Sequence, residues 1–568
     1  MHLSFRGKND EDMKLFKTET IKMMRVNLLM LVCGLFTSQL QAQKVTYSWD
    51  NLPVIAQPQF KKDTFNVLNY GAKPDGVTLN TKAINQAILD CSAKGGGVVL
   101  VPEGYWLTGP IKLQNNVNLH VKKSALLQFS KNLNDYKIVE GNYEGKPSAR
   151  NESPIMGTNL TNIAVTGEGV IDGNGDAWRA VRKSDLTENE WRDKIASGGI
   201  LSDDKRTWYP TAKNKKGHDD KASVLLGPGI KLEDFEPIKD YLRPNLIVLN
   251  NCKNVLLEGV TFQNSPAWNV HPLMCENLTL RNLFIKNPDY AHNGDGADIE
   301  SCKNVLIENC MFDVGDDAIC IKSGKDEEGR KRGIATENVI IRNNTVYKGH
   351  GGFVVGSEMS GGARNIFVYD CTFMGTDKGI RFKTTRGRGG VVENIYIKNI
   401  NMVDIVQEAI FFDMYYWVKS PQANEKTAIP PVTEETPTFK DVYIENIRCN
   451  GANKGIFVRG IPEMPVQNIH MKNLVLKADI GAEFKDAKGI YVTNAEFIVG
   501  HKDKELVYIE TSQDIVFNNI SSNLTDGLLF NLNGANTSGI SVKNSKFPNE
   551  LRKAVFNNNA PGKALKFN

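Results

Sequence analysis

The segment KNVLIENCMF, residues 303–312, decides the fold because variants of it recur along most of the chain. Each copy has a polar residue, then Asn or Asp, then alternating apolar positions, and often a second Asn before another short apolar stretch. The clearest other copies are KNVLLEGVTF (253–262), ENLTLRNLFI (276–285), ENVIIRNNTV (337–346), RNIFVYDCTF (364–373) and ENIYIKNINM (393–402). Their second positions, with that of 303–312 included, are 23, 27, 34, 27 and 29 residues apart, which identifies an internal repeat.

The recurring segment predicts an all-β fold of stacked coils. Alternation of apolar and polar residues marks short strands, and Asn at a turn tolerates unusual backbone angles. A coil of this size cannot bury its apolar residues alone, so successive coils stack around one core. We therefore expect a right-handed, single-stranded parallel β-helix with a hydrogen-bonded ladder of asparagines. A propeller would need regularly spaced Asn-Gly hairpin turns, and a leucine-rich repeat would need its leucine spacing; neither pattern occurs.

Two other segments complete this domain, which we expect to span residues 43–568. NTKAINQAILDCSAKGGG, residues 80–97, predicts a helix that Asn80 caps and the glycines end, covering the N-terminal end of the stack. One face of this helix is apolar, with Ala83, Ile84, Ala87, Ile88 and Cys91. Residues 175–245 are charged with few alternations, and they predict a loop-rich insertion that walls a cleft.

Residues 1–42 are predicted to be a targeting segment rather than part of the fold. Arg25 precedes an apolar run from Leu28 to Phe36, and Ala42 is a plausible cleavage point. The run is too short to span a bilayer, which favours a cleavable signal peptide and a secreted or periplasmic protein. The charged stretch 1–22 precedes two methionines, so a start at one of these and an artefactual upstream stretch is the alternative.

The bulk composition excludes several classes of partner. The net charge is +4, from 69 basic and 65 acidic residues in a chain of 568, which gives no general argument for binding nucleic acid. No second segment predicts a membrane span, and the cysteines show neither CxxC nor zinc spacing. We expect buried free cysteines, no metal, no cofactor and a monomer.

Ionisable residues recur at similar positions in four successive coils. Counted from the ladder Asn of each coil, Asp295 follows by 18 residues, Asp316 and Asp317 by 12 and 13, His350 by 12, and Arg381 and Lys383 by 16 and 18. Strands in a sheet lie about 4.8 Å apart, so four coils place these groups along a strip of roughly 15 Å. We expect the carboxylates to face one another across a groove long enough for a ligand of two or three units.

The residue types in this strip indicate glycoside hydrolysis. Carboxylates at close range push their pKa values apart, so that one can donate a proton while another activates water. Arg381 and Lys383 share one face of a strand, and Arg can grip a carboxylate with two parallel hydrogen bonds. An acidic sugar, a uronic acid, is therefore the expected ligand. His350 is expected to orient or protonate an Asp, and His292 and Tyr415 complete the substrate-binding candidates.

Plainer explanations exist for several neighbouring residues. Asp298 and Asp313 are as well explained as turn residues, and Arg386 and Arg388 as a solvated loop. FFDMYYW, residues 411–417, is more typical of core and rim aromatics than of a sugar platform, although Tyr415 or Tyr416 can reach a substrate. Trp268 and His271 lie one coil before Asp295 and are candidates for extending the site.

Four short blocks resemble those of the polygalacturonases, glycoside hydrolase family 28. NGDG (293–296), GDD (315–317), GHGG (349–352) and RFK (381–383) are similar to the family's Asn-Thr-Asp, Gly-Asp-Asp, Gly-His-Gly and Arg-Ile-Lys, in that order. Gly294 replaces Thr and Phe382 replaces Ile, and neither change removes a charged group. FNVLNYGAKPDGVTLNTKAINQAI, residues 65–88, resembles the family's opening coil and capping helix, and the resemblance covers about residues 62–550.

The resemblance implies hydrolysis of pectic α-1,4-galacturonosyl linkages with inversion. Carried over by position, Asp316 resembles the general acid, Asp295 and Asp317 the pair that activates water, His350 the supporting histidine, and Arg381 and Lys383 the ligands of the substrate carboxylate. Gly294 and the 175–245 insertion resemble bacterial exo-acting members. Alternatives left open are a rhamnogalacturonan hydrolase of the same family, a calcium-dependent lyase on a similar stack, and a non-catalytic glycan-binding β-helix.

Overall fold

The computed structural model describes residues 46–419, 428–501 and 504–568. The chain divides into two compact units, Met1–Leu52 and Pro53–Asn568, and the parallel strands all belong to the second. The predicted targeting segment, residues 1–42, lies outside the described residues. Within the described part of the chain, no helix is both long and apolar enough to cross a membrane.

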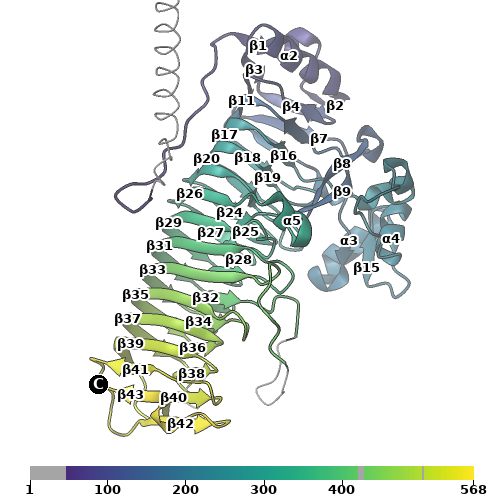
Figure 1. Cartoon of the computed structure of the whole chain (residues 1–568). Coiled ribbons are helices and arrows are strands. Elements are labelled where there is room, and N and C mark those ends of the chain that lie inside the picture. Colours follow the sequence, from purple (N-terminus) through teal and green to yellow (C-terminus); the bar gives the residue numbers. More distant parts are fainter. Residues whose placement is uncertain (1–45, 420–427, 502–503) are drawn as a thin grey trace, which may run out of the picture. The chain divides into compact units, whose positions relative to one another are not determined.

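The second unit is a right-handed parallel β-helix, as the repeat predicted (Figure 1). One coil consists of β22 (Ala297–Glu300), β23 (Lys303–Glu308) and β24 (Met311–Asp313), and the next begins at β25 (Asp317–Lys322). β22 and β25 belong to a 14-stranded parallel sheet, whereas β23 and β24 belong to a 24-stranded sheet that forms the rest of the wall. The buried apolar residues of successive coils form one continuous core.

Two left-handed residues, five positions apart, form the corners of each coil. In the coil of β23 they are Asn304 and Asn309, with φ of 56° and 55°. Asn tolerates this conformation better than other residues that carry a side chain, because its short amide bonds locally. The corresponding residues of the flanking coils are Asn277 with Asn282 and Asn338 with Asn343, all at positive φ. The repeat therefore records backbone corners as well as strands.

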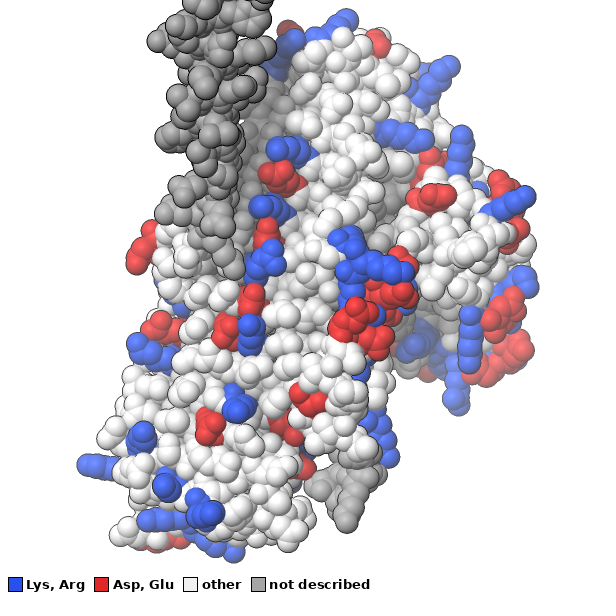
Figure 2. All heavy atoms as spheres, viewed as in Figure 1, with Lys and Arg blue, Asp and Glu red and all other residues white. Residues whose placement is uncertain are grey.

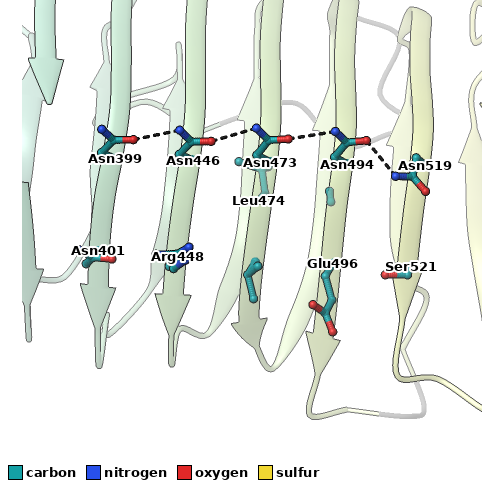
Figure 3. A pocket seen from close by; sticks show the side chains of 12 residues that line it. Asn399, Asn401, Asn446, Arg448, Asn473, Leu474, Asn494, Glu496, Asn519 and Ser521 are labelled. Carbon is teal, nitrogen blue, oxygen red and sulfur yellow. Dashed lines mark hydrogen bonds between the residues drawn. The ribbon is translucent and has the colours of Figure 1, made fainter. Parts of the chain in front are cut away.

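The corner asparagines also bond from coil to coil. Asn304 Nδ2 donates to Asn277 Oδ1 at 3.2 Å, and Asn338 Nδ2 donates to Asn304 Oδ1 at 3.0 Å. A second ladder follows the other corner, where the amides of consecutive coils join head to tail (Figure 3). Its members are Asn399, Asn446, Asn473, Asn494 and Asn519. The predicted asparagine ladder is thus confirmed, and there are two of them.

Charge alternates along the stack beside the first ladder. The residue before each ladder Asn changes sign from coil to coil, as in Lys253–Glu276 at 3.2 Å and Lys303–Glu337 at 3.3 Å. Arg364 continues the row by pairing with Glu337 at 2.5 Å. Side chains of both signs follow one another down the stack in Figure 2. Each exposed pair contributes only about 0–1 kcal/mol, but like charges in this row would oppose the register.

The capping helix is present as α2 (Thr81–Ala93), and it buries Ile84, Ala87, Ile88 and Cys91. Asn80 does not cap it with its side chain, which corrects the sequence interpretation. Its Oδ1 instead accepts a hydrogen bond of 2.7 Å from the backbone N–H of Lys73, and so joins the helix start to the preceding loop. All eight cysteines in the described residues are buried and free, as expected.

The 175–245 insertion is more ordered than the loop-rich prediction. It contains α3 (Glu188–Ala196), α4 (Ala212–Asp219), the 3-10 helix η5 (Leu232–Tyr241) and a small antiparallel sheet of β13 (Val181–Arg182), β15 (Thr207–Tyr209) and β14 (Ile200–Leu201). An antiparallel hairpin, β8 (Ile138–Tyr143) and β9 (Lys146–Asn151), packs with it around Ala149, Phe235 and Leu242. The segments of the insertion are short and charged with isolated apolar residues, so its helices and strands could not be predicted from hydrophobic periodicity.

Replacing a ladder Asn tests the role of the corners. Asn304→Ala loses two side-chain hydrogen bonds, each worth about 1 kcal/mol, and places Ala in a left-handed conformation that costs roughly 1–2 kcal/mol. We predict a loss of about 2–4 kcal/mol in the free energy of unfolding, measured by urea denaturation followed by circular dichroism. Asn304→Gly removes the same hydrogen bonds without the steric cost, so it should lose clearly less. Equal losses would mean that the left-handed corner is not the constraint.

Candidate active site

The predicted site residues converge on one cavity of about 730 Å³ on the 14-stranded sheet. They lie at or next to four consecutive strands: β22, β25, β28 (Gly351–Val355) and β30 (Ile380–Lys383). Asp295, Asp316, Asp317, His350, Arg381, Lys383 and His292 all line the cavity. The central expectation from the sequence, a common groove for these groups, therefore agrees with the geometry.

Strand register brings the carboxylates together. The N–H of Gly296 donates to the carbonyl of Asp317 at 2.9 Å, and Ala297 pairs with Ile319. Asp295 therefore lies beside Asp317 one coil away. Asp317 in turn pairs with Gly351, which follows His350. The stacking of coils, rather than proximity in sequence, creates the cluster.

Two glycines allow the backbone to approach closely here. A Cβ on Gly315 would lie 2.5 Å from the carbonyl oxygen of Pro288 in the preceding coil. A Cβ on Gly294 would lie 2.6 Å from the carbonyl oxygen of Ala291, to which its own N–H donates. With the backbone as it stands, a side chain at either position would meet these carbonyl oxygens. Gly315 thus serves close packing between coils, while Asp316 and Asp317 both face the cavity.

The three aspartates form one cluster. One oxygen from each of Asp295, Asp316 and Asp317 lies within 4.8 Å of the others. Asp295 and Asp317 are 3% and 1% exposed, whereas the side chain of Asp316 is 21% exposed. A large ligand in the cavity therefore meets Asp316 first, and a small molecule such as water can reach the other two.

Asp317 is held between two cations. Its Oδ1 accepts a hydrogen bond from Arg381 Nη1 at 2.8 Å, and its Oδ2 accepts one from Lys383 Nζ at 2.6 Å. Burial alone would raise the pKa of Asp317, but the charges of Lys383 and Arg381 outweigh it and hold the pKa far below the usual value. Asp317 is therefore ionised, and both cations are already partly neutralised before any substrate binds.

Asp316 is paired with His350. His350 Nδ1 donates to Asp316 Oδ1 at 3.1 Å, and its Nε2 lies 3.9 Å from Asp377 Oδ2. This hydrogen bond raises the pKa of His350. Burial works to raise the pKa of Asp316, but the histidine lowers it on balance. The pair is thus a hydrogen-bonded imidazole–carboxylate contact at the exposed edge of the cluster.

No cation of the described residues forms an ion pair with Asp295, although the charge of Lys322 works to lower its pKa. Burial, followed by the negative charges of Asp298 and Asp316, raises the pKa of Asp295 well above its usual value. Of the three carboxyls in the cluster, Asp295 is therefore the one that holds a proton most readily. Because the three carboxyls lie so close together, they titrate as one system rather than as independent groups.

The remaining substrate-binding candidates lie differently. His292 is half exposed at the rim, 3.7 Å from Asp185 of the insertion. Tyr415 does not line the cavity, which corrects that prediction: it is buried, with its ring between the guanidinium groups of Arg386 and Arg459. Its neighbour Tyr416 lines the cavity instead, with Lys383 Nζ 4.8 Å above its ring. Strand alternation does not extend past β32 (Glu408–Asp413), so the sequence could not choose between the two.

A second layer of charge lies behind the cluster. Lys322 Nζ bonds Glu358 at 2.8 Å, lies 3.5 Å from Asp298, and sits 4.7 Å from the centre of the Trp268 ring. Lys322 was not among the site residues predicted from the sequence. The spacing could have identified it, because Lys322 follows Asn304 by 18 residues, as Lys383 follows Asn365. Asp298 is a fully buried strand residue rather than a turn residue.

Three other neighbours singled out in the sequence fall outside or at the edge of the cavity. Asp313 lies on β24, outside the cavity. His271 does not line it either and bonds buried Glu300 at 2.8 Å. Arg388 lines the cavity and is paired with Asp326, so it is more than a solvated loop residue.

The arrangement can donate a proton, activate water and receive an acidic ligand. Carboxylate oxygens at this spacing are also able to bind a cation, but Arg381 and Lys383 already supply two positive charges to Asp317. A carboxylate cluster in a cleft of a parallel β-helix defines the class of protein: a glycoside hydrolase built from stacked coils.

Comparisons with known proteins identify the family. Residues 237–496 match glycosyl hydrolases family 28, and residues 64–197 match the group described as rhamnogalacturonase A/epimerase, pectate lyase-like. The exopolygalacturonase of Thermotoga maritima is 32% identical, with a TM-score of 0.62 over 76% of this chain and 91% of that one. The exo-poly-alpha-D-galacturonosidase of Dickeya chrysanthemi is 28% identical over 70% of this chain and 64% of its own length. An endo-polygalacturonase of Pectobacterium carotovorum is 26% identical over 72% and 86%. The chain belongs to glycoside hydrolase family 28.

Removing one cation tests the electrostatics of Asp317. Lys383→Met leaves a buried carboxylate short of a partner, and we predict a loss of about 3 kcal/mol in unfolding free energy at pH 7. The folded pKa of Asp317 lies below its unfolded value of about 4, so its stabilisation is present above that pH and fades as pH falls through the folded pKa. The difference between wild type and variant in urea unfolding should therefore shrink towards pH 3.

The matched control is the double variant Asp317→Asn/Lys383→Met, which removes the stranded charge. It should recover part of the lost stability at pH 7. A Lys383→Met loss that is the same at pH 7 and pH 3 would contradict the assignment.

Proposed function

We propose that the protein hydrolyses α-1,4-galacturonosyl linkages of pectic polysaccharide by acid–base catalysis with inversion. The observation that carries this proposal is the cluster of Asp295, Asp316 and Asp317, joined to Arg381 and Lys383 in one cavity of a family 28 β-helix. The names of the relatives support galacturonan as the substrate class. Arg381 keeps donors that Asp317 does not use, so it can bind a substrate carboxylate in addition.

Exposure and charge suggest the division of roles. Asp316 is the most exposed carboxyl of the cluster and is the general acid that reaches the glycosidic oxygen. Asp295 and Asp317 lie deeper and activate a water molecule, which is small enough to reach them. A carboxylate buried beside two cations is poorly placed to attack the anomeric carbon itself, which argues against a covalent intermediate. Oxygens of the three carboxyls lie within 4.8 Å of one another, so this argument for inversion rests on charge and not on a wide carboxyl separation. His350 is a positioning residue for Asp316.

The proton must reach Asp316 when substrate binds. Without substrate the pKa of Asp295 is raised and that of Asp316 is lowered, so Asp295 holds a proton more readily. A sugar that covers Asp316 removes its remaining water, which raises its pKa. Asp295, in the same cluster, can then give up its proton and become the base. When the proton passes from Asp295 to Asp316, Asp316 thus becomes the acid and Asp295 the base, because the three carboxyls titrate as one system.

Exo action is the finer part of the proposal. Glu144 of the β8–β9 turn and His292, which contacts Asp185 of the insertion, both line the catalytic cavity. Structure added at one end of a groove limits how far a polymer can extend past the cluster. Rhamnogalacturonan hydrolysis is the second candidate, favoured by the match of residues 64–197 to the rhamnogalacturonase group.

Asp316→Asn tests the acid assignment. The amide cannot donate the proton of a carboxylic acid, so kcat on polygalacturonate should fall by at least about 100-fold, measured by release of reducing ends. Binding of trigalacturonate and the unfolding midpoint should change little. Asp313→Asn is the matched control, because this Asp lies outside the cavity, and it should keep wild-type activity. Near-normal turnover by Asp316→Asn would refute the role.

Product analysis tests the substrate and the mode of action. On polygalacturonate, an exo enzyme releases monomer from the outset, whereas a ladder of oligomers would show endo action. Products that absorb in the near ultraviolet and disappear with a chelator would show a lyase instead. Faster release from rhamnogalacturonan than from polygalacturonate would favour the second candidate.

A further inference from the structure

A second cavity, of about 480 Å³, adjoins the catalytic one. It is lined by the β8–β9 hairpin, by the 175–245 insertion, which includes Arg243, and by His292, Asn293 and Lys325. Four residues line both cavities: Glu144, His292, Asn293 and Lys325. The two spaces are therefore neighbours with a common rim, and a chain that leaves the catalytic cluster on this side enters the second cavity.

The lining of the second cavity is strongly cationic. Its basic residues are Lys146, Arg150, Arg179, Arg182, Arg243 and Lys325, and its single acidic residue is Glu144. Three of the cations have a carboxylate partner: Lys146 pairs with Asp326, Arg179 with Asp176 and Lys325 with Glu144. The catalytic cavity differs, because Lys322, Arg381 and Lys383 are paired with carboxylates that line the same cavity.

Arg150, Arg182 and Arg243 have no carboxylate partner among the described residues, and of these Arg182 is exposed, whereas Arg150 and Arg243 lie deeper. Arg150 is only 8% exposed, and no carboxylate of the described residues forms an ion pair with it; its guanidinium lies 5.0 Å from the centre of the Tyr143 ring. Arg243 donates only to neutral oxygens, those of Pro266, His292 and Asn293. Burying a guanidinium without a counter-ion is costly, so a ligand that supplies negative charge is the natural complement.

Nearby titrating groups report the same positive potential. Burial, followed by the charge of Arg243, lowers the pKa of Arg150 to about 10. Burial and Arg243 likewise lower the pKa of His218 to about 4, and burial and Arg182 lower that of His292. His218 is therefore neutral at pH 7, as expected for a largely buried base near positive charge.

We infer that the second cavity binds the carboxylate of a uronic acid residue at the end of the substrate chain, between Arg150 and Arg243. This inference rests on the proposed function, because it takes the ligand to be continuous with the chain in the catalytic cavity. Tyr143, Tyr241 and Val224 provide apolar surface for the faces of a sugar ring. A guanidinium pair recognises a planar carboxylate better than a neutral sugar, so this site selects substrate chains whose terminal sugar has a free carboxylate.

The test uses the Asp316→Asn background, in which ligand is bound but not consumed. Adding Arg150→Met should raise the Kd for trigalacturonate, measured by calorimetry, by about ten- to a hundredfold, the range expected for a charged hydrogen bond. Arg150→Lys keeps the positive charge but cannot form two parallel hydrogen bonds to a carboxylate, so its Kd should rise by less than that of Arg150→Met. Arg192→Met, on α3 and outside the cavity, is the matched control and should leave the Kd unchanged.

Two further measurements separate the explanations. Without ligand, Arg150→Met should unfold at the same or a higher temperature than its parent, because an unpaired buried charge is removed. Trigalacturonate should then stabilise it less than it stabilises the parent. Neutral galacto-oligosaccharides should bind parent and variant alike, and stronger binding of inorganic phosphate than of trigalacturonate would point to a free anion instead.

The outcomes also distinguish this inference from the proposed function. If wild type cleaves polygalacturonate and Asp316→Asn does not, but Arg150→Met binds trigalacturonate as tightly as its parent, the second site is refuted and the function stands. If wild type fails to cleave polygalacturonate at all, the proposed function itself is refuted.

Discussion

The register between successive coils is the constraint on which the rest of the structure depends. Each coil turns at two left-handed residues five positions apart, and the amides at these corners bond the coil to its neighbours. A shift of one residue would break both ladders and turn the inward side chains of a strand outward. The same register sets Asp295 beside Asp317, and Asp317 beside the glycine that follows His350. The active site is thus a consequence of stacking, and no single coil contains it.

Charge placed on this scaffold differentiates three chemically identical side chains. Asp317 lies between two cations, Asp316 touches a histidine at the exposed edge, and at Asp295 burial and like charge outweigh the more distant charge of Lys322. Their pKa values are consequently pushed in different directions, which is what acid–base catalysis requires. The stacked coils tolerate this concentration of buried charge because a large continuous core supports it. Beyond the cluster, the unpaired Arg150 and Arg243 leave positive charge where an acidic chain would end.

Most of the fold and most of the active-site residues could be predicted from the sequence, and the predictions that were wrong have physical causes. The repeat predicted the β-helix, the asparagine ladder that includes Asn304, and the convergence of the ionisable residues on one groove. Counted offsets misplace rows, however: Asp295 and Asp317 are neighbours although they follow their ladder residues by 18 and 13 positions, because turn lengths differ between coils. Tyr415 was chosen over Tyr416 beyond the end of a strand, where alternation carries no information. The insertion and the β8–β9 hairpin lack periodicity, so the second cavity could be found only in three dimensions.

The most direct test of the central claim is a crystal structure of Asp316→Asn with an oligogalacturonide bound. The account predicts a glycosidic oxygen within about 3 Å of the residue 316 side chain, a water beside Asp295 and Asp317, and a sugar carboxylate against Arg381. A ligand bound on another face of the β-helix, or aspartates turned away from the scissile bond, would contradict it.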